Sequence, residues 1–147
     1  MKILGLKYKK IKSPKTGRIW LDRNIGAGRV AESSLDRLSY GHYLTHREAK
    51  AIAKLVKGFR LPTPEEFKAE ELKNSIFALR NLRLPMSGYR DTSGTTLYYA
   101  GAHGFYWSSS VTSARYAHNL HFKTTALNPA NNSNRANGFS VRLIKDK

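Results

Sequence analysis

The sequence predicts one α+β domain, with two helices packed on short antiparallel strands and a C-terminal half that is rich in loops. Three observations support this class. The middle of the chain holds two capped helical segments, the N-terminal region holds two apolar segments around a turn, and glycines and prolines divide the remainder. A chain of 147 residues, 40% of them hydrophobic, can bury one core but is too short for two ordinary domains. We therefore expect residues 1–147 to form a single domain.

The N-terminal region has the pattern of two short strands, at residues 3–8 and 18–21, joined by a turn at residues 13–17. The lysines concentrated here are Lys7, Lys9, Lys10, Lys12 and Lys15. They either contact a polyanion or protect an exposed edge strand, and we favour the second interpretation. Residues 24–28 form a glycine-containing loop without the Gly-Lys-Ser/Thr sequence of a phosphate-binding loop. No nucleotide site is predicted there.

Two helices are predicted from capping residues that precede apolar periodicity. Thr45 and Glu48 have the spacing of a capping box, and Gly58 ends the first helix. Its apolar stripe consists of Ala49, Ile52, Ala53 and Val56. The second helix begins at residues 63–66, where a proline in the first turn and two glutamates suit a helix N-terminus. We expect it to reach about Leu72, with a further turn to Leu79.

The C-terminal half is divided by glycines and prolines into short segments. Residues 106–109, 117–122 and 139–144 are the predicted strands. In the last of them apolar residues alternate with Ser140 and Arg142, which predicts one face toward the core and the other outward.

The net charge of +16 is unevenly distributed. Residues 1–91 carry 20 Lys/Arg against 9 Asp/Glu, whereas residues 92–147 carry 6 against 1. Such a surface attracts polyanions without selecting one, so weak, non-specific nucleic-acid binding is expected. The N-terminus lacks the apolar core of a signal peptide, and no segment has transmembrane length. No membrane insertion is predicted, localisation is unknown, and display on a virion or cell surface would need another route.

The segment from Thr92 to Asp146 contains no carboxylate before its last residue, although it holds six of the nine asparagines. Amides, hydroxyls and imidazoles can recognise a ligand, but no side-chain carboxylate is available there for acid–base work or hard metals. The five histidines are His42, His46, His103, His118 and His121. The chain has no cysteine, and an offset of three places the last two on opposite faces of a strand. We predict no catalytic residue, no metal site and no cofactor, and histidines that are exposed or on a binding surface.

The aromatic residues divide into two sets. Trp20, Phe59, Trp107 and Phe139 adjoin strand signals and are expected in the core. The second set lies among polar loop residues and consists of Tyr98, Tyr99, Phe105, Tyr106 and Tyr116. Some of its members should line a surface, as tyrosines do in binding loops, and about half of them should be buried.

Five motifs occur in one order along the chain: Trp20–Ala27, Phe59–Phe67, Leu84–Asp91, Gly104–Ser110 and Arg135–Arg142. In this order the chain resembles the C-type-lectin-like superfamily related to formylglycine-generating enzymes. More narrowly it is similar to the variable proteins of diversity-generating retroelements and to a paralogous family of bacterial surface domains. The resemblance extends from about Trp20 to the end, and the asparagine-rich sequence of residues 128–142 is its most specific part.

The resemblance implies a C-type-lectin-like fold with a diversified region at about residues 97–142, in which template adenines are randomised and asparagine codons change. It implies a constant frame at residues 107–109, Leu120, Phe122, residues 128–130 and residues 138–142. The implied variable, ligand-binding positions are Tyr99, His103, Phe105, Val111, Thr112, Tyr116, His118, His121 and Ser133. Formylglycine-generating enzymes hold copper with cysteines and sugar-binding C-type lectins hold calcium with carboxylates. This chain lacks both sets at the matching positions.

The function expected from these features is non-enzymatic binding of a protein or glycan on a host or partner cell, or carried by a virus. The alternative is a small basic nucleic-acid-binding protein, and an enzyme is the least favoured reading. Two structural expectations follow. Residues 139–144 should return beside residues 3–8, and Leu120 and Phe122 should point inward. The side chains expected to share one exposed face are Tyr99, His103, Phe105, Tyr116, His118 and His121.

Overall fold

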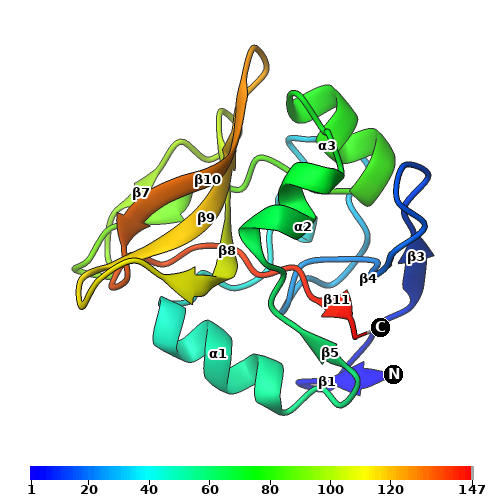
Figure 1. Cartoon of the computed structure of the whole chain (residues 1–147), viewed down its shortest axis with the longest axis horizontal. Coiled ribbons are helices and arrows are strands. Elements are labelled where there is room, and N and C mark those ends of the chain that lie inside the picture. The colour runs from blue at the N-terminus through cyan, green and yellow to red at the C-terminus, as the bar shows by residue number, and fades with distance from the viewer. Residues whose placement is uncertain (147) are drawn as a thin grey trace.

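The computed structural model describes residues 1–146, which form a mixed domain of three α-helices and several small antiparallel sheets (Figure 1). Its elements in chain order are β1 (Lys2–Ile3), β2 (Leu6–Lys7), β3 (Lys10–Lys12), β4 (Ile19–Leu21), the 3-10 helix η1 (Arg37–Ser39), α1 (His46–Lys54), β5 (Phe59–Arg60), α2 (Pro64–Ala69), α3 (Ser75–Leu82), β6 (Tyr89–Arg90), β7 (Leu97–Tyr98), β8 (Gly104–Val111), β9 (Tyr116–Phe122), β10 (Leu127–Asn134) and β11 (Ile144–Lys145). The predicted α+β class, with helices and short antiparallel strands, is confirmed. No helix in residues 1–146 is long and apolar enough to cross a membrane.

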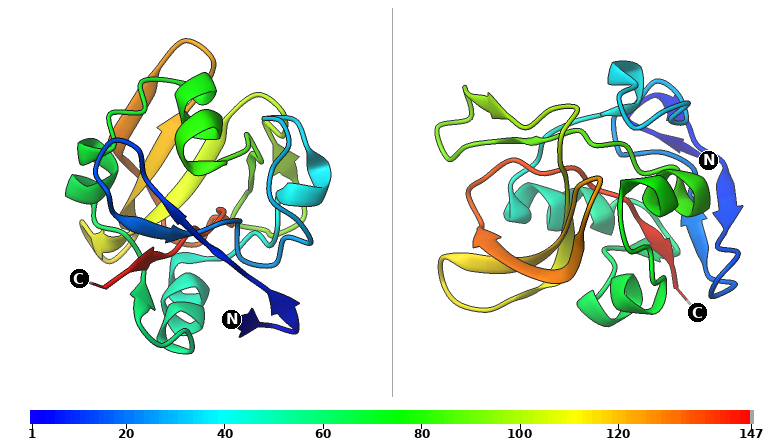
Figure 2. Two further views of the ribbon diagram at one scale, coloured as in Figure 1. Left: turned by 90° about the vertical axis from the view of Figure 1, so that its right-hand side faces the viewer. Right: turned by 90° about the horizontal axis from the view of Figure 1, so that it is seen from above.

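One four-stranded sheet, in the order β3-β4-β11-β5, joins the two ends of the chain. The predicted N-terminal turn is confirmed as the β3–β4 hairpin, but residues 3–8 do not take part in it. They contribute to a separate β1–β2 hairpin, because Leu4 and Gly5 both adopt positive φ, as a two-residue hairpin turn requires. The expectation that residues 139–144 return beside residues 3–8 is therefore wrong. Ile144 pairs instead with β4 and β5, and both termini lie on the same side of the domain (Figures 1 and 2).

The helices begin where the capping residues predict. The side chains of Thr45 and Thr63 each accept a hydrogen bond from the backbone of the glutamate three residues later, and both capping boxes are complete. The expected extension of the second helix to Leu79 is wrong, because the chain turns between α2 and a third helix, α3. Glu71 and Lys73 in this turn have positive φ, and Asn74 caps α3. Residues 1–146 therefore contain three α-helices instead of the two predicted.

The end of α2 is fixed by a carboxylate whose role the sequence did not reveal. Glu70 is buried, and its oxygens accept hydrogen bonds from Trp20 Nε1, at 3.1 Å, from Ser13 Oγ, and from Thr16 Oγ1, at 2.7 Å. These bonds tie the helix to the β3–β4 hairpin.

The longest strands form a second sheet in the order β10-β9-β8. The prediction of a loop-rich C-terminal half is wrong here, because the asparagine-rich residues form strand β10. Asparagine and proline are poor strand residues, but β10 is an edge strand, and its register shifts between Asn128 and Asn131. Pro129 lies within that irregularity, where a missing N–H is tolerated.

Two hydrophobic cores lie on opposite faces of the β8–β9–β10 sheet. Phe105, Trp107 and Ala117 pack with residues of α1, whereas Tyr106, Leu120, Phe122 and Trp20 pack with residues of α2 and α3. The four aromatic residues assigned to the core are buried, as predicted: Trp20, Phe59, Trp107 and Phe139. Leu120 and Phe122 also point inward, as expected.

Residues 139–144 do not form the predicted strand with one outward face. Of these residues only Ile144 belongs to β11, and Ser140 and Arg142 are as completely buried as Val141 between them. Ser140 Oγ lies 2.5 Å from Ser87 Oγ. Arg142 donates from Nη2 to Asn24 Oδ1 and to the Arg83 carbonyl, both at 2.9 Å. Both faces of the segment can be buried because Ser140 and Arg142 find hydrogen-bond partners inside the protein.

Candidate ligand-binding surface

The nine positions implied as variable fall into two groups at opposite ends of the β8–β9–β10 sheet. The imidazole cluster consists of Tyr99, His103, Phe105 and His121, and the hairpin group consists of Val111, Thr112, Tyr116, His118 and Ser133. His121 and Tyr116 are five residues apart on β9, an odd offset that places their side chains on opposite faces of the strand, and Phe105 is only 7% exposed. The expectation of one shared exposed face is therefore wrong.

The imidazole cluster is a stack of four rings. Ring centroids are 4.4 Å apart between Tyr99 and His103, 4.9 Å between His103 and His121, and 4.5 Å between His121 and Phe105. His103 Nδ1 lies 2.7 Å from His121 Nε2, so one imidazole donates to the other. Tyr99 is 54% exposed and forms the outer end of the stack. The cluster thus presents one aromatic face and the edges of two imidazoles to solvent.

Two glycines hold the segments of this cluster close together. Gly88 has φ +70, and a Cβ there would overlap the Tyr98 carbonyl oxygen and the amide of Ala100. A Cβ on Gly104 would overlap the Phe122 ring. The amide of Gly88 also donates to the His103 carbonyl, at 2.8 Å. The backbone that carries the cluster is therefore fixed by close approach as well as by strand pairing.

Both imidazoles of the cluster favour the neutral form. Burial lowers the pKa of His103, and the charge of Lys123 lowers it further. Burial likewise lowers the pKa of His121, with contributions from His103 and Lys123. A neutral pair can place one donor and one acceptor at its outer nitrogens, since the inner pair shares a single proton. The cluster therefore suits a neutral or polar ligand group better than a cation.

Phe105 differs from the expectation of an exposed contact residue. It is only 7% exposed and packs against Phe139 and Tyr89, with centroids 5.0 and 4.9 Å away. Strand alternation places it on the same side of β8 as the buried Trp107. Phe105 is therefore the floor of the imidazole cluster, and His121 covers it.

The hairpin group is more open. Val111 is 45% and Tyr116 43% exposed, and Thr112 Oγ1 donates to Asn132 Oδ1 at 2.8 Å. Ser110 Oγ lies 2.8 Å from His118 Nδ1, on the face of β9 opposite His121, as their offset of three predicts. Ser133, opposite Ala117 on β10, is half-buried. The exposed side chains at this end of the sheet are accessible to a ligand.

The sequence did not indicate that Tyr89 belongs beside the imidazole cluster. Its ring contacts those of Tyr98, Tyr99 and Phe105, with centroids 5.4, 6.2 and 4.9 Å away. The β6–β7 hairpin brings it there by pairing Tyr89 with Tyr98. An aromatic residue on each side of Gly94 was the signal that could have found this pair.

The expectation that the histidines are exposed or on a binding surface is wrong for His46. It is fully buried, with Nε2 2.8 Å from the Ser108 carbonyl oxygen and its ring 5.1 Å from that of Trp107. Burial lowers its pKa, against the hydrogen bond to Ser108. His46 therefore anchors the start of α1 to β8. Within residues 1–146 there is no group of three or more His, Cys, Asp or Glu side chains suited to a metal ion.

These features define an α+β domain with a half-exposed aromatic and imidazole surface on a rigid antiparallel sheet. Residues 28–144 match the family described as "Domain of unknown function (DUF8237)", and the chain belongs to that family. The matched region contains all three α-helices and the β8–β9–β10 sheet, and begins after β4. No curated protein and no solved structure matches the chain.

Proposed function

We propose that this chain is a non-enzymatic binding protein of the kind diversified by retroelements, with a C-type-lectin-like fold. Its outward side chains between residues 97 and 142 would recognise a protein or glycan on a host or partner cell. The observation that carries the proposal is the contrast along β9. His121 and Tyr116 reach the surface, while Leu120 and Phe122 have no exposed area.

Several residues of the implied frame and several of the implied variable positions differ in burial, which supports the proposal. Among frame residues, Trp107, Phe139 and Val141 are at most 1% exposed. Tyr99 and Tyr116, at implied variable positions, are each more than 40% exposed. Diversification is tolerated where a side chain does not fill the core, because only core substitutions create cavities or overpacking.

The chemistry of the outward residues suits recognition. Tyrosine offers a large, rigid contact area with a polar tip, and it loses little conformational entropy on binding. The imidazole edges of His103 and His121 add a donor and an acceptor beside that area. Recognition by a few such anchors needs neither a deep cleft nor a catalytic group.

The genomic neighbourhood tests this proposal most cheaply. The proposal predicts a near-copy of the coding sequence for about the last 45 residues, differing at adenines, beside a reverse-transcriptase gene. Clones from one population should differ at the codons of Tyr99, His103 and Tyr116 and agree at those of Trp107 and Phe139. A locus without a repeat, or clones that vary equally at frame codons, would refute it.

A basic nucleic-acid-binding protein is the second candidate, and the surface of β1 to β3 favours it. Five exposed lysines of this region make no ion pair within residues 1–146: Lys2, Lys7, Lys9, Lys10 and Lys12. Lysines of this kind give affinity that falls steeply with salt and lacks sequence preference. Titration against unrelated duplexes at low and physiological salt separates the candidates, because tight binding at physiological salt would favour the second.

A further inference from the structure

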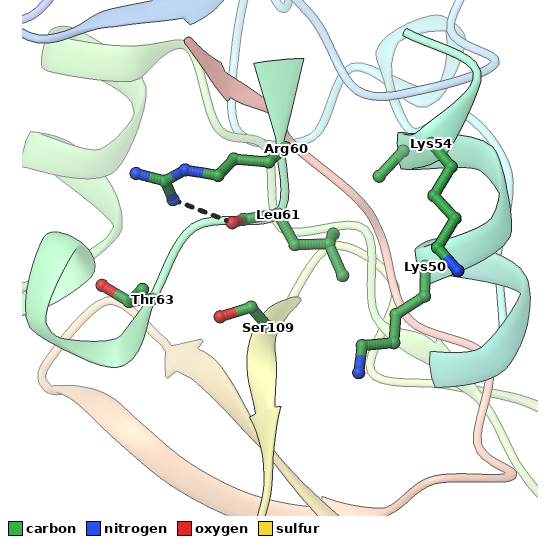
Figure 3. Close-up of a pocket in the computed structure, with 7 residues that line it drawn as sticks. Lys50, Lys54, Arg60, Leu61, Thr63 and Ser109 are labelled. Carbon is green, nitrogen blue, oxygen red and sulfur yellow. Dashed lines mark hydrogen bonds between the residues drawn. The ribbon is translucent and has the colours of Figure 1, made fainter. Parts of the chain in front are cut away.

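A pocket of about 320 Å³ lies outside the implied variable positions, between α1, the β5–α2 connection and β8 (Figure 3). Its volume is at the lower end of the range for small-molecule sites. Lys50 and Lys54 of α1 form one side, Leu61 points toward them, and Ser109 of β8 also lines the pocket. The backbone amide of Ser109 donates to the Pro62 carbonyl at 2.8 Å, which fixes β8 against the connection. The pocket is therefore bounded by ordered elements.

The inner wall of the pocket is apolar. Ala53 and Leu61 contribute to it, and both are buried, at 8% and 3% exposure. The methylene stems of Lys50 and Lys54 extend it toward solvent (Figure 3). A ligand with a short apolar body can remove this surface from water, and that burial is favourable.

The charge at the mouth of the pocket is positive and uncompensated. Lys50 and Lys54 are one helical turn apart and exposed, and neither makes an ion pair within residues 1–146. Arg60 on the opposite side is already paired, at 2.7 Å to Glu66 and 2.9 Å to Asp146. Burial alone would raise the pKa of Glu66, but its bonds from Arg60 and Thr63 lower it to about 2, so the pair stays ionised. Two lysines on successive turns of α1 therefore lack a counter-charge among residues 1–146.

We propose that this pocket binds a small amphipathic monocarboxylate. The carboxylate lies between the Lys50 and Lys54 ammonium groups, and the apolar body rests on Ala53 and Leu61. Two like charges on successive turns repel each other, and one bound carboxylate relieves that repulsion. The apolar wall favours an alkyl acid over an inorganic anion.

Titration with octanoate, followed by backbone amide NMR shifts, tests this directly. The account predicts saturable shifts confined to residues 50–54, Leu61, Thr63 and Ser109. The uncharged probe 1-octanol should bind about tenfold more weakly, and inorganic phosphate should produce no shifts centred on Leu61. Equal affinity for octanoate and octanol would overturn the carboxylate assignment.

Lysine-to-glutamine variants supply the matched test. The double variant Lys50→Gln/Lys54→Gln should lose about tenfold or more in octanoate affinity. Its melting temperature should stay close to that of the parent, because both side chains are exposed. Lys57→Gln, an exposed lysine near the same helix that does not line the pocket, should leave affinity unchanged. If both variants bind octanoate as the parent does, the proposal is wrong.

Discussion

The network around Arg142 and the imidazole cluster are both polar constellations that join distant segments, but they differ in burial. The Arg142 guanidinium is fully buried and donates to Asn24 and to the carbonyls of Leu21, Leu82 and Arg83. The histidines of the imidazole cluster share one hydrogen bond between themselves and are partly exposed. A sealed network can only stabilise the fold, whereas an open one has groups left for a ligand.

The largest effect is expected from removing the sealed charge. Burial lowers the pKa of Arg142 to about 10, so the guanidinium remains charged at neutral pH. Arg142→Met leaves Asn24 Oδ1 and three carbonyls without this donor, which should cost about 3–5 kcal/mol of unfolding free energy in urea denaturation. The exposed Arg115→Met should stay within about 0.5 kcal/mol of the parent. Similar losses for both variants would contradict a structural role specific to Arg142.

The next effect separates the floor of the imidazole cluster from its outer end. Phe105→Ala removes a buried ring from contact with Tyr89 and Phe139 and should cost about 3 kcal/mol. Tyr99→Ala truncates a side chain that is 54% exposed and should cost less than about 0.5 kcal/mol. Calorimetric melting of the two variants measures this difference. Equal losses would mean that Tyr99 also belongs to the core.

A smaller effect tests how the backbone of the imidazole cluster is fixed. Gly88→Ala places a Cβ against the Tyr98 carbonyl at φ +70 and should cost about 2 kcal/mol, because strain and overlap add. Gly94→Ala at φ +76 has no atom within 4 Å of the new Cβ and should cost only about 1 kcal/mol. Chemical denaturation measures the unfolding free energy of both variants. An equal loss would contradict the claim that close approach at Gly88 fixes this backbone.

The smallest effect is the response of the imidazole cluster to acid. Burial lowers the pKa values of His103 and His121 below the ordinary value of 6.5, so the unfolded chain binds more protons as pH falls. Their contribution to stability is therefore complete above pH 6.5 and decreases as pH falls through the lowered values. The double variant His103→Phe/His121→Phe should show a weaker loss of stability between neutral and acidic pH, with the part due to His46 remaining. An unchanged pH dependence would show that the two imidazoles are not desolvated.

The helices were predictable because their signals are local. The side chains of Thr45, Glu48, Thr63 and Glu66 form the capping boxes that their spacing predicts. The break before α3 was not predictable in this way, because the buried partners of Glu70 come from a hairpin more than fifty residues earlier. Local pattern therefore gives the start of a helix more reliably than its end.

The site was predictable only in part for the same reason. Strand alternation correctly placed Leu120 and Phe122 inward and separated His118 from His121. The burial of Phe105 depends on Phe139 and on a hairpin partner that periodicity does not reveal. Strand β10 was missed because its asparagines and proline oppose strand formation, and pairing with β9 overrides that preference.

The central claim is that outward positions on a fixed frame can vary while the fold persists. Two libraries test it under one protease challenge. The first randomises Tyr99, His103, Tyr116 and His121, and the second randomises the buried frame residues Trp107, Leu120, Phe122 and Phe139. The account predicts that most members of the first library remain folded and resistant, and that most members of the second are degraded. Equal survival of the two libraries would contradict it.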